Sequence, residues 1–332
     1  MTIVLSLYNE RAVIQQKVQN FRELNYPLDR LSLAVGMDGC DDGTEGALAA
    51  VLDNRIQPFV FERRQGKTAV LNKIIASTNS DIVVFTDANA MFDSEAVREL
   101  VRPFADPAVG LVSGRSIVLG SDSDATVHNT YYRWLTRLKG QETESGSLVG
   151  ADGAIYAMRR QLLEPLSPEF INDLTHPIQV VLHGARAILA PAAIAREPLD
   201  DWTFRGEFWR QVRMTAQAMH VVASFTPTLI RSRCLGYAIR LGLTKVLRWC
   251  LPALTVGGVI SAMLMALQGS AVAGVIVTCL LVGLAVSLVG LSTSFLPFRS
   301  LAYALVVGAA YSVGLYKWAA GEKFITWQPR TG

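Results

Sequence analysis

The sequence has few of the residues that build metal-bound or disulfide-linked domains. Its 332 residues include four cysteines and four histidines, scattered without a CxxC pair or histidines at zinc-ligand spacing. Disulfide frameworks and structural zinc sites need such residues in clusters. The pattern excludes a zinc finger and a secreted disulfide scaffold, and it indicates a reducing compartment.

Charge of either sign is missing from one long stretch. Residues 249–298 contain no Asp, Glu, Lys or Arg, which leaves room for two transmembrane helices of about 20 residues each. A third apolar run, residues 301–316, is of marginal length. The chain is 51% hydrophobic and has a mean hydropathy of +0.30. We therefore expect two to three membrane helices over residues 249–320 and a tail at 321–332.

Acidic residues are absent from residues 208–248, just before the first apolar run. The segment instead carries seven basic residues: Arg210, Arg213, Arg231, Arg233, Arg240, Lys245 and Arg248. Basic residues beside a membrane span favour the cytoplasmic side and attract anionic lipid. The pattern predicts basic interfacial helices over 206–248 and a cytoplasmic domain on the inner cell membrane, held by a multi-pass anchor. No nucleic-acid-binding motif accompanies the charge, so nucleic acid is not an expected partner.

The topology of the third apolar run is left open by the same rule. A hairpin at residues 268–270 is expected outside and Arg299 inside. A third span would then leave Lys317, Lys323 and Arg330 outside, against the rule. Either the third run is re-entrant or interfacial, or the tail is tolerated.

The phosphate-binding loop of P-loop nucleoside triphosphatases is also absent. Residues 65–68 resemble the end of that motif, but Phe61 stands where its first glycine is required. What remains is a basic loop that contains Gly66 and precedes a helix with one apolar face. Such a loop can meet a diphosphate through Lys67 and the helix N-terminus; a solvated basic loop is the alternative.

The apolar residues 82–85 form the clearest strand of a soluble α/β domain expected over residues 1–205. The strand runs into Asp87 and Asn89. Ligands of open α/β sheets bind beyond the carboxyl ends of the strands, and these two oxygen-bearing side chains suit a divalent cation such as Mg²⁺. The alternative is a turn that caps the following helix.

Two further strands end in polar residues. Tyr8 and Glu10 follow the expected strand 2–7, and Asp38 follows the expected strand 31–35. In a parallel sheet the three side chains lie together, where they suit a nucleobase and a ribose, although each can also be a simple turn former. A third strand is expected over 58–62.

The second part of the soluble domain offers two more acids. Asp152 lies in a small-residue turn before an expected strand at 154–158, where a substrate can approach the backbone closely. Asp173 precedes an expected helix over 177–183 and is either its N-cap or a general base. Aromatic residues in 131–138 either line a groove or pack.

In this order the motifs resemble the membrane-anchored family 2 glycosyltransferases of GT-A fold, which include the bacterial cellulose and poly-N-acetylglucosamine synthases. The resemblance covers about residues 1–250. It is carried by seven segments in chain order: LSLYNE, MDGCDDGT, QGKTAVLN, FTDANA, GADGAIYAMRR, IND and RQVRM.

The resemblance implies an α/β GT-A domain, Rossmann-like and nucleotide-sugar-binding, with C-terminal transmembrane helices. It assigns donor contacts to Tyr8, Glu10, Asp38, Lys67 and Asp87. It further implies Mg²⁺ or Mn²⁺ on Asp87 and Asn89, acceptor or diphosphate contacts for Asp152, Arg210 and Arg213, and Asp173 as the catalytic base.

The chain departs from the family pattern at several positions. Asn89 replaces the second acid of the metal motif, Arg210 the glutamine of QxxRW, and Met214 its tryptophan. The tryptophan is associated with stacking on the acceptor sugar, so processive synthesis is in question. The sequence also starts at the first strand, without the N-terminal membrane helix of many relatives, which fits a shorter architecture or a misassigned start.

The implied reaction is inverting transfer of a sugar from a nucleotide donor, a UDP-sugar, to an acceptor hydroxyl in cell-surface or extracellular polysaccharide synthesis. Implied partners are the donor, a glycan or lipid-linked acceptor, membrane lipid and possible synthase-complex subunits. Two alternatives stay open: single transfer to a polyprenyl phosphate, and a catalytically idle subunit that binds nucleotide-sugar.

Overall fold

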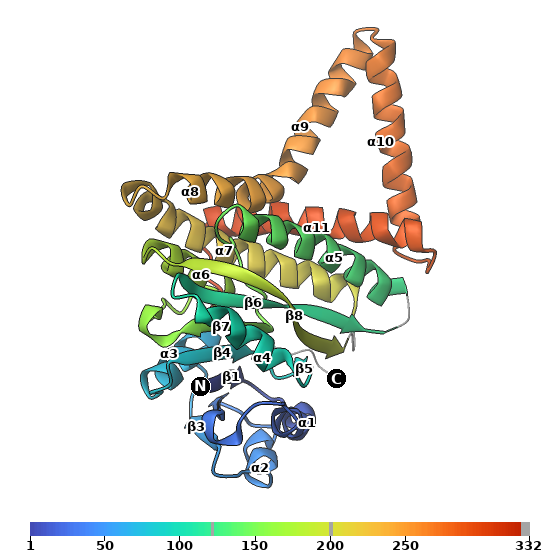
Figure 1. Ribbon diagram of the computed structural model, residues 1–332. Helices are drawn as coiled ribbons and strands as arrows, with labels where there is room; N and C mark the ends of the chain where they lie inside the picture. Colours follow the sequence, from blue (N-terminus) through green and yellow to red (C-terminus); the bar gives the residue numbers. More distant parts are fainter. Residues whose placement is uncertain (121–122, 199–201, 327–332) are drawn as a thin grey trace.

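Buried apolar runs form the centre of a mixed β-sheet in the computed structural model, which describes residues 1–120, 123–198 and 202–326 (Figure 1). The strands are β1 (Thr2–Leu7), β2 (Ser32–Asp38), β3 (Ile56–Phe61), β4 (Ile82–Thr86), β5 (Met91–Phe92), β6 (Val109–Leu119), β7 (Ile155–Arg159) and β8 (Arg186–Pro198). Their order in the sheet is β3-β2-β1-β4-β7-β6-β8-β5.

Four neighbouring strands, β3, β2, β1 and β4, are parallel. The carboxyl ends of these strands therefore share one edge of the sheet, the edge that bears Tyr8, Asp38 and Asp87. Strand β7 runs antiparallel to β4 and to β6, while β8 is parallel to β6. Because β7 reverses the direction, the turn that holds Asp152 starts from the same edge.

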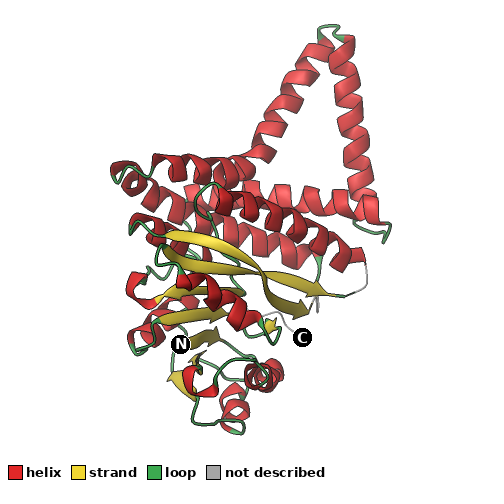
Figure 2. Cartoon of the chain, viewed as in Figure 1, coloured by secondary structure: helices red, strands yellow, loops and turns green. Residues whose placement is uncertain are grey.

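Helices cover both faces of the parallel strands (Figure 2). The helices are α1 (Arg11–Arg22), α2 (Thr44–Ala49), α3 (Lys67–Ala76), α4 (Ala96–Val101), α5 (Ser123–Glu144), α6 (Asn172–Leu182), α7 (Phe204–Arg231), α8 (Leu235–Leu241), α9 (Leu247–Leu267), α10 (Ala271–Gly290) and α11 (Leu296–Ala319). Alternate residues of β1 point to opposite sides: Ile3 packs in one core with Val18 of α1, and Val4 in another with Val70 of α3. The sheet is thus buried on both faces, as the continuous apolar runs predict.

One expected element boundary is corrected by the structure, and one strand was not expected. Helix α6 begins at Asn172 and not at Pro177, and its N-cap position is Ile171. Asp173 therefore lies inside the first turn and is not the cap. Strand β8 was not expected, because its sequence, RAILAPAAIAREP, combines a proline with small residues that give no clear alternation.

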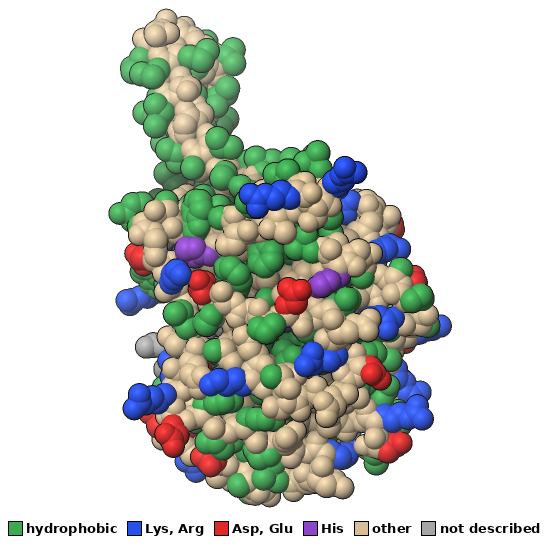
Figure 3. Space-filling view, turned by 90° about the vertical axis from the view of Figure 1, so that its left-hand side faces the viewer, with side chains coloured by type: hydrophobic (Ala, Val, Ile, Leu, Met, Phe, Trp, Pro, Cys, Tyr) green, Lys and Arg blue, Asp and Glu red, His purple; other side chains and the backbone are tan. Residues whose placement is uncertain are grey.

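The apolar C-terminal half forms a helical layer and a hairpin that rises from it (Figure 1). Three helical stretches are long and apolar enough to cross a membrane, namely 235–267, 271–290 and 296–319. Helices α9 and α10 make the hairpin, whose surface in Figure 3 is covered with hydrophobic side chains. The described part of the chain thus carries the apolar surface of a membrane-associated protein.

Helix α11 differs from the two hairpin helices. It lies across the foot of the hairpin and along α7 (Figure 1), and it buries Ala302, Val307 and Ala310. A third of its most apolar window is buried, against none for the first candidate span. This packing favours the interfacial alternative for the third apolar run.

The chain then returns to the soluble domain. The Gln217 side chain donates to the Phe324 carbonyl (2.6 Å), and Lys323 pairs with Glu169 (2.9 Å). A side chain added at Gly66 would meet the Ile325 carbonyl at 2.4 Å. The end of the described chain therefore lies beside the loop that precedes α3. Arg330 and the rest of the expected tail after residue 326 lie outside the described residues.

The domain division expected at 1–205, 206–248, 249–320 and 321–332 stays a prediction. Helix α7 starts at Phe204, and its buried face includes Val212, Ala216 and Val221. Val221 shares a core with Leu174 of α6, as do Ala218 and Met219 of the same helix. The basic segment is therefore packed against the sheet domain along one side of α7.

We expect Gly36→Ala to destabilise the protein by about 1–3 kcal/mol through overpacking. A Cβ at Gly36 would lie 2.3 Å from a Val70 methyl and 2.7 Å from an Ile74 methyl. Thermal unfolding in detergent measures the effect. Gly46→Ala is the matched control, since its Cβ would meet nothing within 4 Å and a helical alanine is favoured over glycine. Equal unfolding temperatures of the two variants would contradict the packing described.

Candidate active site

The loops after β1 and β2 are tied to each other at the carboxyl edge of the sheet. The Asn9 side chain donates to Asp41 (2.7 Å), and the Glu10 backbone amide donates to the Thr44 hydroxyl (2.9 Å). Asn9 adopts a φ of 55°, a conformation that asparagine tolerates better than most residues. These contacts tie the loop of Tyr8 and Glu10 to the loop that follows Asp38, and the parallel register pairs Leu7 with Met37, so Tyr8 and Asp38 follow at the same level of the sheet.

Asp38 fixes the loop that precedes α3. Its buried carboxylate accepts hydrogen bonds from the backbone amides of Gln65 (2.6 Å) and Gly66 (2.8 Å). Gly66 has a φ of 92°, which favours glycine. The Arg64 guanidinium lies 3.7 Å from the centre of the Tyr8 ring. A planar cation thus covers the aromatic face expected to meet a nucleobase.

Lys67 and Asp87 meet between α3 and the end of β4. The Lys67 ammonium donates to the Asp87 carboxylate. Burial disfavours the charged lysine, but the Asp87 carboxylate outweighs this effect and raises the pKa of Lys67. Lys67 is also the first residue of α3, where the helix dipole is unfavourable to a cation and favourable to an anion. An anion such as a diphosphate is therefore suited to this position.

Asp87 and Asn89 fit a divalent cation only together with a bound diphosphate. In the described part of the chain no group of three or more His, Cys, Asp or Glu side chains is placed to hold a metal ion. The Asp87 side chain is 40% exposed, and Asn89 adds one amide oxygen. Mg²⁺ and Mn²⁺ commonly take one or two protein oxygens and complete their shell with phosphate oxygens and water. The donor set suits that shared coordination.

Lys17, which was not singled out from the sequence, packs beneath the loop of residues 87–89, here called the metal loop. This residue of α1 is 3% exposed, and its ammonium donates to the Thr86 hydroxyl (2.9 Å) and to the Ala90 carbonyl. Burial lowers the pKa of Lys17 to about 7, despite the nearby Asp87 carboxylate. A lysine on the apolar face of a helix was the available signal. Its two contacts bracket residues 87–89.

The proline in α6 explains how Asp173 is placed. Pro177 has no N–H to donate to the carbonyl four residues earlier, and that carbonyl, of Asp173, accepts instead from the Ala151 amide (2.8 Å). The Asp173 carboxylate rests against Gly153, where an added Cβ would lie 3.3 Å from it. The small residues of the 150–153 turn therefore admit Asp173.

A second contact brings the start of α6, which carries Asp173, to the start of α3, which carries Lys67. The Thr68 hydroxyl lies 2.8 Å from the Phe170 carbonyl and 3.0 Å from the Asn172 side-chain oxygen. The first turns of α3 and α6 are thereby held together. Burial raises the pKa of Asp173. Nearby cations oppose this shift, and Lys67 has the largest effect among them. Asp87 and Asp173 thus flank one lysine.

Glu10 and Glu197 add carboxylates to the same region. Burial, followed by the Asp87 and Asp42 charges, raises the pKa of Glu10. Burial, followed by the Asp152 and Asp87 charges, raises the pKa of Glu197 to about 7. Glu197 was not predicted as a site residue. It lies at the carboxyl end of β8, a strand that was not expected from the sequence. A diphosphate with its cation would have to be accommodated among these acids.

Asp152 is held by the neighbouring strand. Its carboxylate accepts from the backbone amide (2.9 Å) and the hydroxyl (2.8 Å) of Ser116. Its own amide donates to the Ser113 hydroxyl (2.8 Å). These bonds anchor the turn to β6, so the predicted acceptor contact of Asp152 would be made by a fixed carboxylate.

The two arginines of the RQVRM segment point to different partners. Arg210 forms a two-point ion pair with Glu207 (2.8 and 2.9 Å), which lowers the pKa of the buried Glu207 to about 2 against the effect of burial. Burial, helped by Arg210, lowers the pKa of Arg213 to about 10, although Asp87 opposes the shift. Arg213 is therefore charged at neutral pH and feels the charge of Asp87, whereas the charge of Arg210 is offset by Glu207 within α7.

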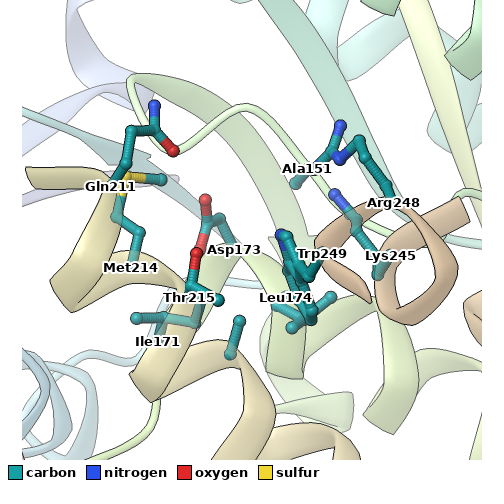
Figure 4. A pocket seen from close by; sticks show the side chains of 12 residues that line it. Ala151, Ile171, Asp173, Leu174, Gln211, Met214, Thr215, Lys245, Arg248 and Trp249 are labelled. Atoms are coloured by element: carbon teal, nitrogen blue, oxygen red, sulfur yellow. The ribbon is translucent and has the colours of Figure 1, made fainter. Parts of the chain in front are cut away.

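A cavity lies on the membrane side of Asp173 (Figure 4). Figure 4 shows Asp173 at its centre, Gln211, Met214 and Thr215 on one side, and Lys245 and Arg248 on the other. Trp249 also lines it, so a tryptophan from α9 enters the site whose motif tryptophan is replaced by Met214. Asp87 and Asp38 are not part of the cavity. Lys245 and Trp249 were missed because only helix packing brings them to Asp173.

The mixed sheet, with acidic residues beyond the carboxyl ends of its parallel strands, is arranged as in the GT-A class of folds. A mannosyltransferase from Pyrobaculum calidifontis, solved with GDP-Man and Mn²⁺, has the same fold: the TM-score is 0.73 at 23% identity, over 97% of this chain and 87% of that one. The predicted fold class is confirmed. Residues 2–166 match the family described as glycosyl transferase family 2, and this part of the chain is a family 2 glycosyltransferase domain.

Curated relatives agree with this family. Beta-monoglucosyldiacylglycerol synthase of Synechocystis is 32% identical over 120 residues, which are 35% of this chain and 25% of that protein. The probable glycosyltransferase YdaM of Bacillus subtilis is 24% identical over 247 residues, 68% of this chain and 56% of that protein. The matched part of the chain thus spans about a quarter to just over half of the length of these relatives.

We expect Asp38→Asn to open the loop before α3. An amide offers one acceptor oxygen to two backbone donors and turns its own NH₂ towards one of them, at a cost of about 1–3 kcal/mol. Hydrogen exchange at the Gln65 and Gly66 amides should quicken, and the unfolding temperature should fall. Asp29→Asn is the control, because its side chain is 80% exposed. Unchanged protection of the two amides would contradict the assignment.

Proposed function

We propose that the chain is a membrane-associated, inverting glycosyltransferase that moves a sugar from a nucleoside diphosphate sugar, a UDP-sugar, to an acceptor hydroxyl in cell-surface or extracellular polysaccharide synthesis. The observation that carries the proposal is the placement of Lys67, which donates to Asp87 and opposes the upward pKa shift of Asp173. A diphosphate anchor and a candidate base are thereby brought to one position.

The proposed roles follow from the chemistry of each group. Lys67 and Arg213 bind the diphosphate, and Tyr8, Glu10 and Asp38 shape the nucleoside end. A divalent cation on Asp87 and Asn89 would supply charge neutralisation for the departing diphosphate. Asp173 accepts the acceptor proton as the hydroxyl oxygen attacks the anomeric carbon. Attack from the Asp173 side and departure on the Asp87 side form a single displacement, which inverts the anomeric centre.

Membrane association fits an acceptor that is itself at the membrane. The cavity beside Asp173 is lined from α7 and from the start of α9, whose continuation forms the apolar hairpin. An acceptor can therefore reach Asp173 from the bilayer surface, on the side opposite the donor loops. This geometry supports a lipid-linked or membrane-bound glycan acceptor.

The proposal is tested by transfer assays on the purified full chain with a panel of UDP- and GDP-sugars and Mn²⁺ or Mg²⁺. We expect Asp173→Asn to lower kcat by roughly 10²–10⁴-fold, the contribution of a general base, with the donor KM unchanged. Asp87→Asn should instead raise the donor KM and the metal concentration needed for half-maximal activity. The anomeric configuration of the product, compared by NMR with that of the donor, tests inversion, and product length separates one addition from many.

Asp81→Asn is the control, since this exposed residue precedes β4 at the opposite edge of the sheet. Donor binding without nucleoside diphosphate release in the unaltered chain would indicate the idle subunit and refute the proposal. Full turnover by Asp173→Asn would remove Asp173 from the mechanism.

We expect kcat to fall at low pH with an apparent pKa above that of a free aspartate. The base must be ionised to accept a proton, and burial disfavours the ionised form. The fall of kcat at low pH, here called the acid limb, should therefore lie at a higher pH than for a free aspartate. Lys139 is one of the cations that favour the ionised form. Lys139→Gln should therefore move the limb to higher pH at saturating substrates, whereas Arg137→Gln, on the same helix, should leave it in place. Identical limbs in the two variants would contradict the assignment.

A further inference from the structure

The cavity beside Asp173 holds more positive charge than the proposed reaction uses. Lys245 lies in a π-helical turn, Gly242–Val246, between α8 and α9, and Arg248 follows at the start of α9. A smaller adjoining cavity shares both residues and adds Lys139 of α5. Turns of π-helix occur often at functional sites. Three cations, two from the helical stretch 235–267 and one from α5, thus converge at the foot of the membrane hairpin.

Two of the polar groups that line the larger cavity lack partners. The Lys245 ammonium makes no hydrogen bond or ion pair within the described residues, and it lies against Gly150, where an added Cβ would be 3.1 Å away. The Thr215 hydroxyl is 1% exposed and has no hydrogen-bond partner among the described residues. Buried polar groups are normally paired. The unpaired donors indicate a ligand with acceptor oxygens.

The carboxylates that face these cations do not neutralise them. Asp173 is one, and the proposed reaction uses it as the base. Glu142 is the other, and one of its oxygens accepts from the Val149 amide (3.1 Å). Three cations against two carboxylates leave net positive charge, which a bound anion would offset.

Apart from Gln211, the remaining side chains of the lining are apolar. Leu174, Met214, Ala218 and Trp249 complete the wall of a cavity of about 70 Å³, which has room for a phosphate group and not for a whole lipid. Outside it, Leu251 and Leu254 of α9 are more than half exposed. A ligand with an anionic headgroup and an apolar chain fits this sequence of surfaces from the cavity to the hairpin.

The geometry points to a phosphate-bearing membrane lipid as the acceptor, with its phosphate on Lys245 and Arg248 and a neighbouring headgroup hydroxyl at Asp173. This inference rests on the proposed function and names its acceptor class. The hydroxyl oxygen forms the new bond to the anomeric carbon, and its proton passes to Asp173. The bond from that carbon to the donor phosphate breaks, and the nucleoside diphosphate leaves with the electron pair.

Binding is measured first, without donor, on the full chain in phosphatidylcholine nanodiscs. The added lipids are phosphatidylinositol, which has a phosphate and hydroxyls, and diacylglycerol, which has a hydroxyl alone. We expect Lys245→Gln and Arg248→Gln each to weaken phosphatidylinositol binding by roughly tenfold or more, as for a lost charge-assisted hydrogen bond. Diacylglycerol binding should be weak and unaffected. Equal binding of the two lipids, or unaltered binding by both variants, would overturn the inference.

Arg231→Gln and Arg233→Gln are the matched controls. Both arginines belong to the same basic segment, are exposed and lie outside the cavity, so their loss reports general attraction to anionic lipid. If they weaken binding as much as Lys245→Gln does, the lipid is held by the surface and not by the cavity, which refutes the inference.

Turnover is measured second, with labelled donor. We expect label in phosphatidylinositol, with a raised lipid KM and an unchanged donor KM in Lys245→Gln. Label in diacylglycerol at equal efficiency would overturn the inference while the proposed function stands. Label in phosphatidic acid, which has no headgroup hydroxyl, would show that the phosphate itself is the nucleophile and refute the role given to the hydroxyl. Selective lipid binding without any donor turnover would refute the proposed function and leave the lipid site supported.

Discussion

The contact between Lys67 and Asp87 is the interaction on which the candidate site depends. A lysine in the first position of a helix is opposed by the helix dipole, and here the acid at the end of β4 offsets that cost. The pair joins the loop fixed by Asp38 to the loop supported by Lys17. In the proposed reaction the diphosphate would pair with Lys67 and the divalent cation with Asp87, so each of the two residues would keep an opposite charge beside it.

The second constraint is the junction of α3 with α6. Thr68 bridges to Phe170 and Asn172, and the carbonyl freed by Pro177 binds Ala151. Through these contacts the Phe170 and Asp173 carbonyls each receive a hydrogen-bond donor. Asp173 is thereby fixed from two sides. The same contacts hold the cavity beside Asp173 in a fixed position relative to the start of α3, where Lys67 lies.

The sequence allowed much of the sheet to be predicted, because β1, β2 and β4 are apolar runs that end in polar residues. It did not allow β8 to be predicted, since alanines and Pro191 give that strand no alternation, and Glu197 was lost with it. Pro177 suggested a helix start where the structure has a helix interior. Lys245 and Trp249 lie more than 70 residues from Asp173 in the sequence, and only the packing of α8 against α7 and of α9 against α11 brings them to the site.

The return of the chain to the donor edge decides where a reporter can be fused. The Ile325 carbonyl faces Gly66, so a fluorescent protein or affinity tag that follows residue 326 would begin beside the loop before α3. Met1 lies at the other end of β1, where its amino group donates to the Arg30 carbonyl (3.1 Å). An amino-terminal fusion therefore leaves the substrate entrance clear, and labels for imaging or purification are better attached there.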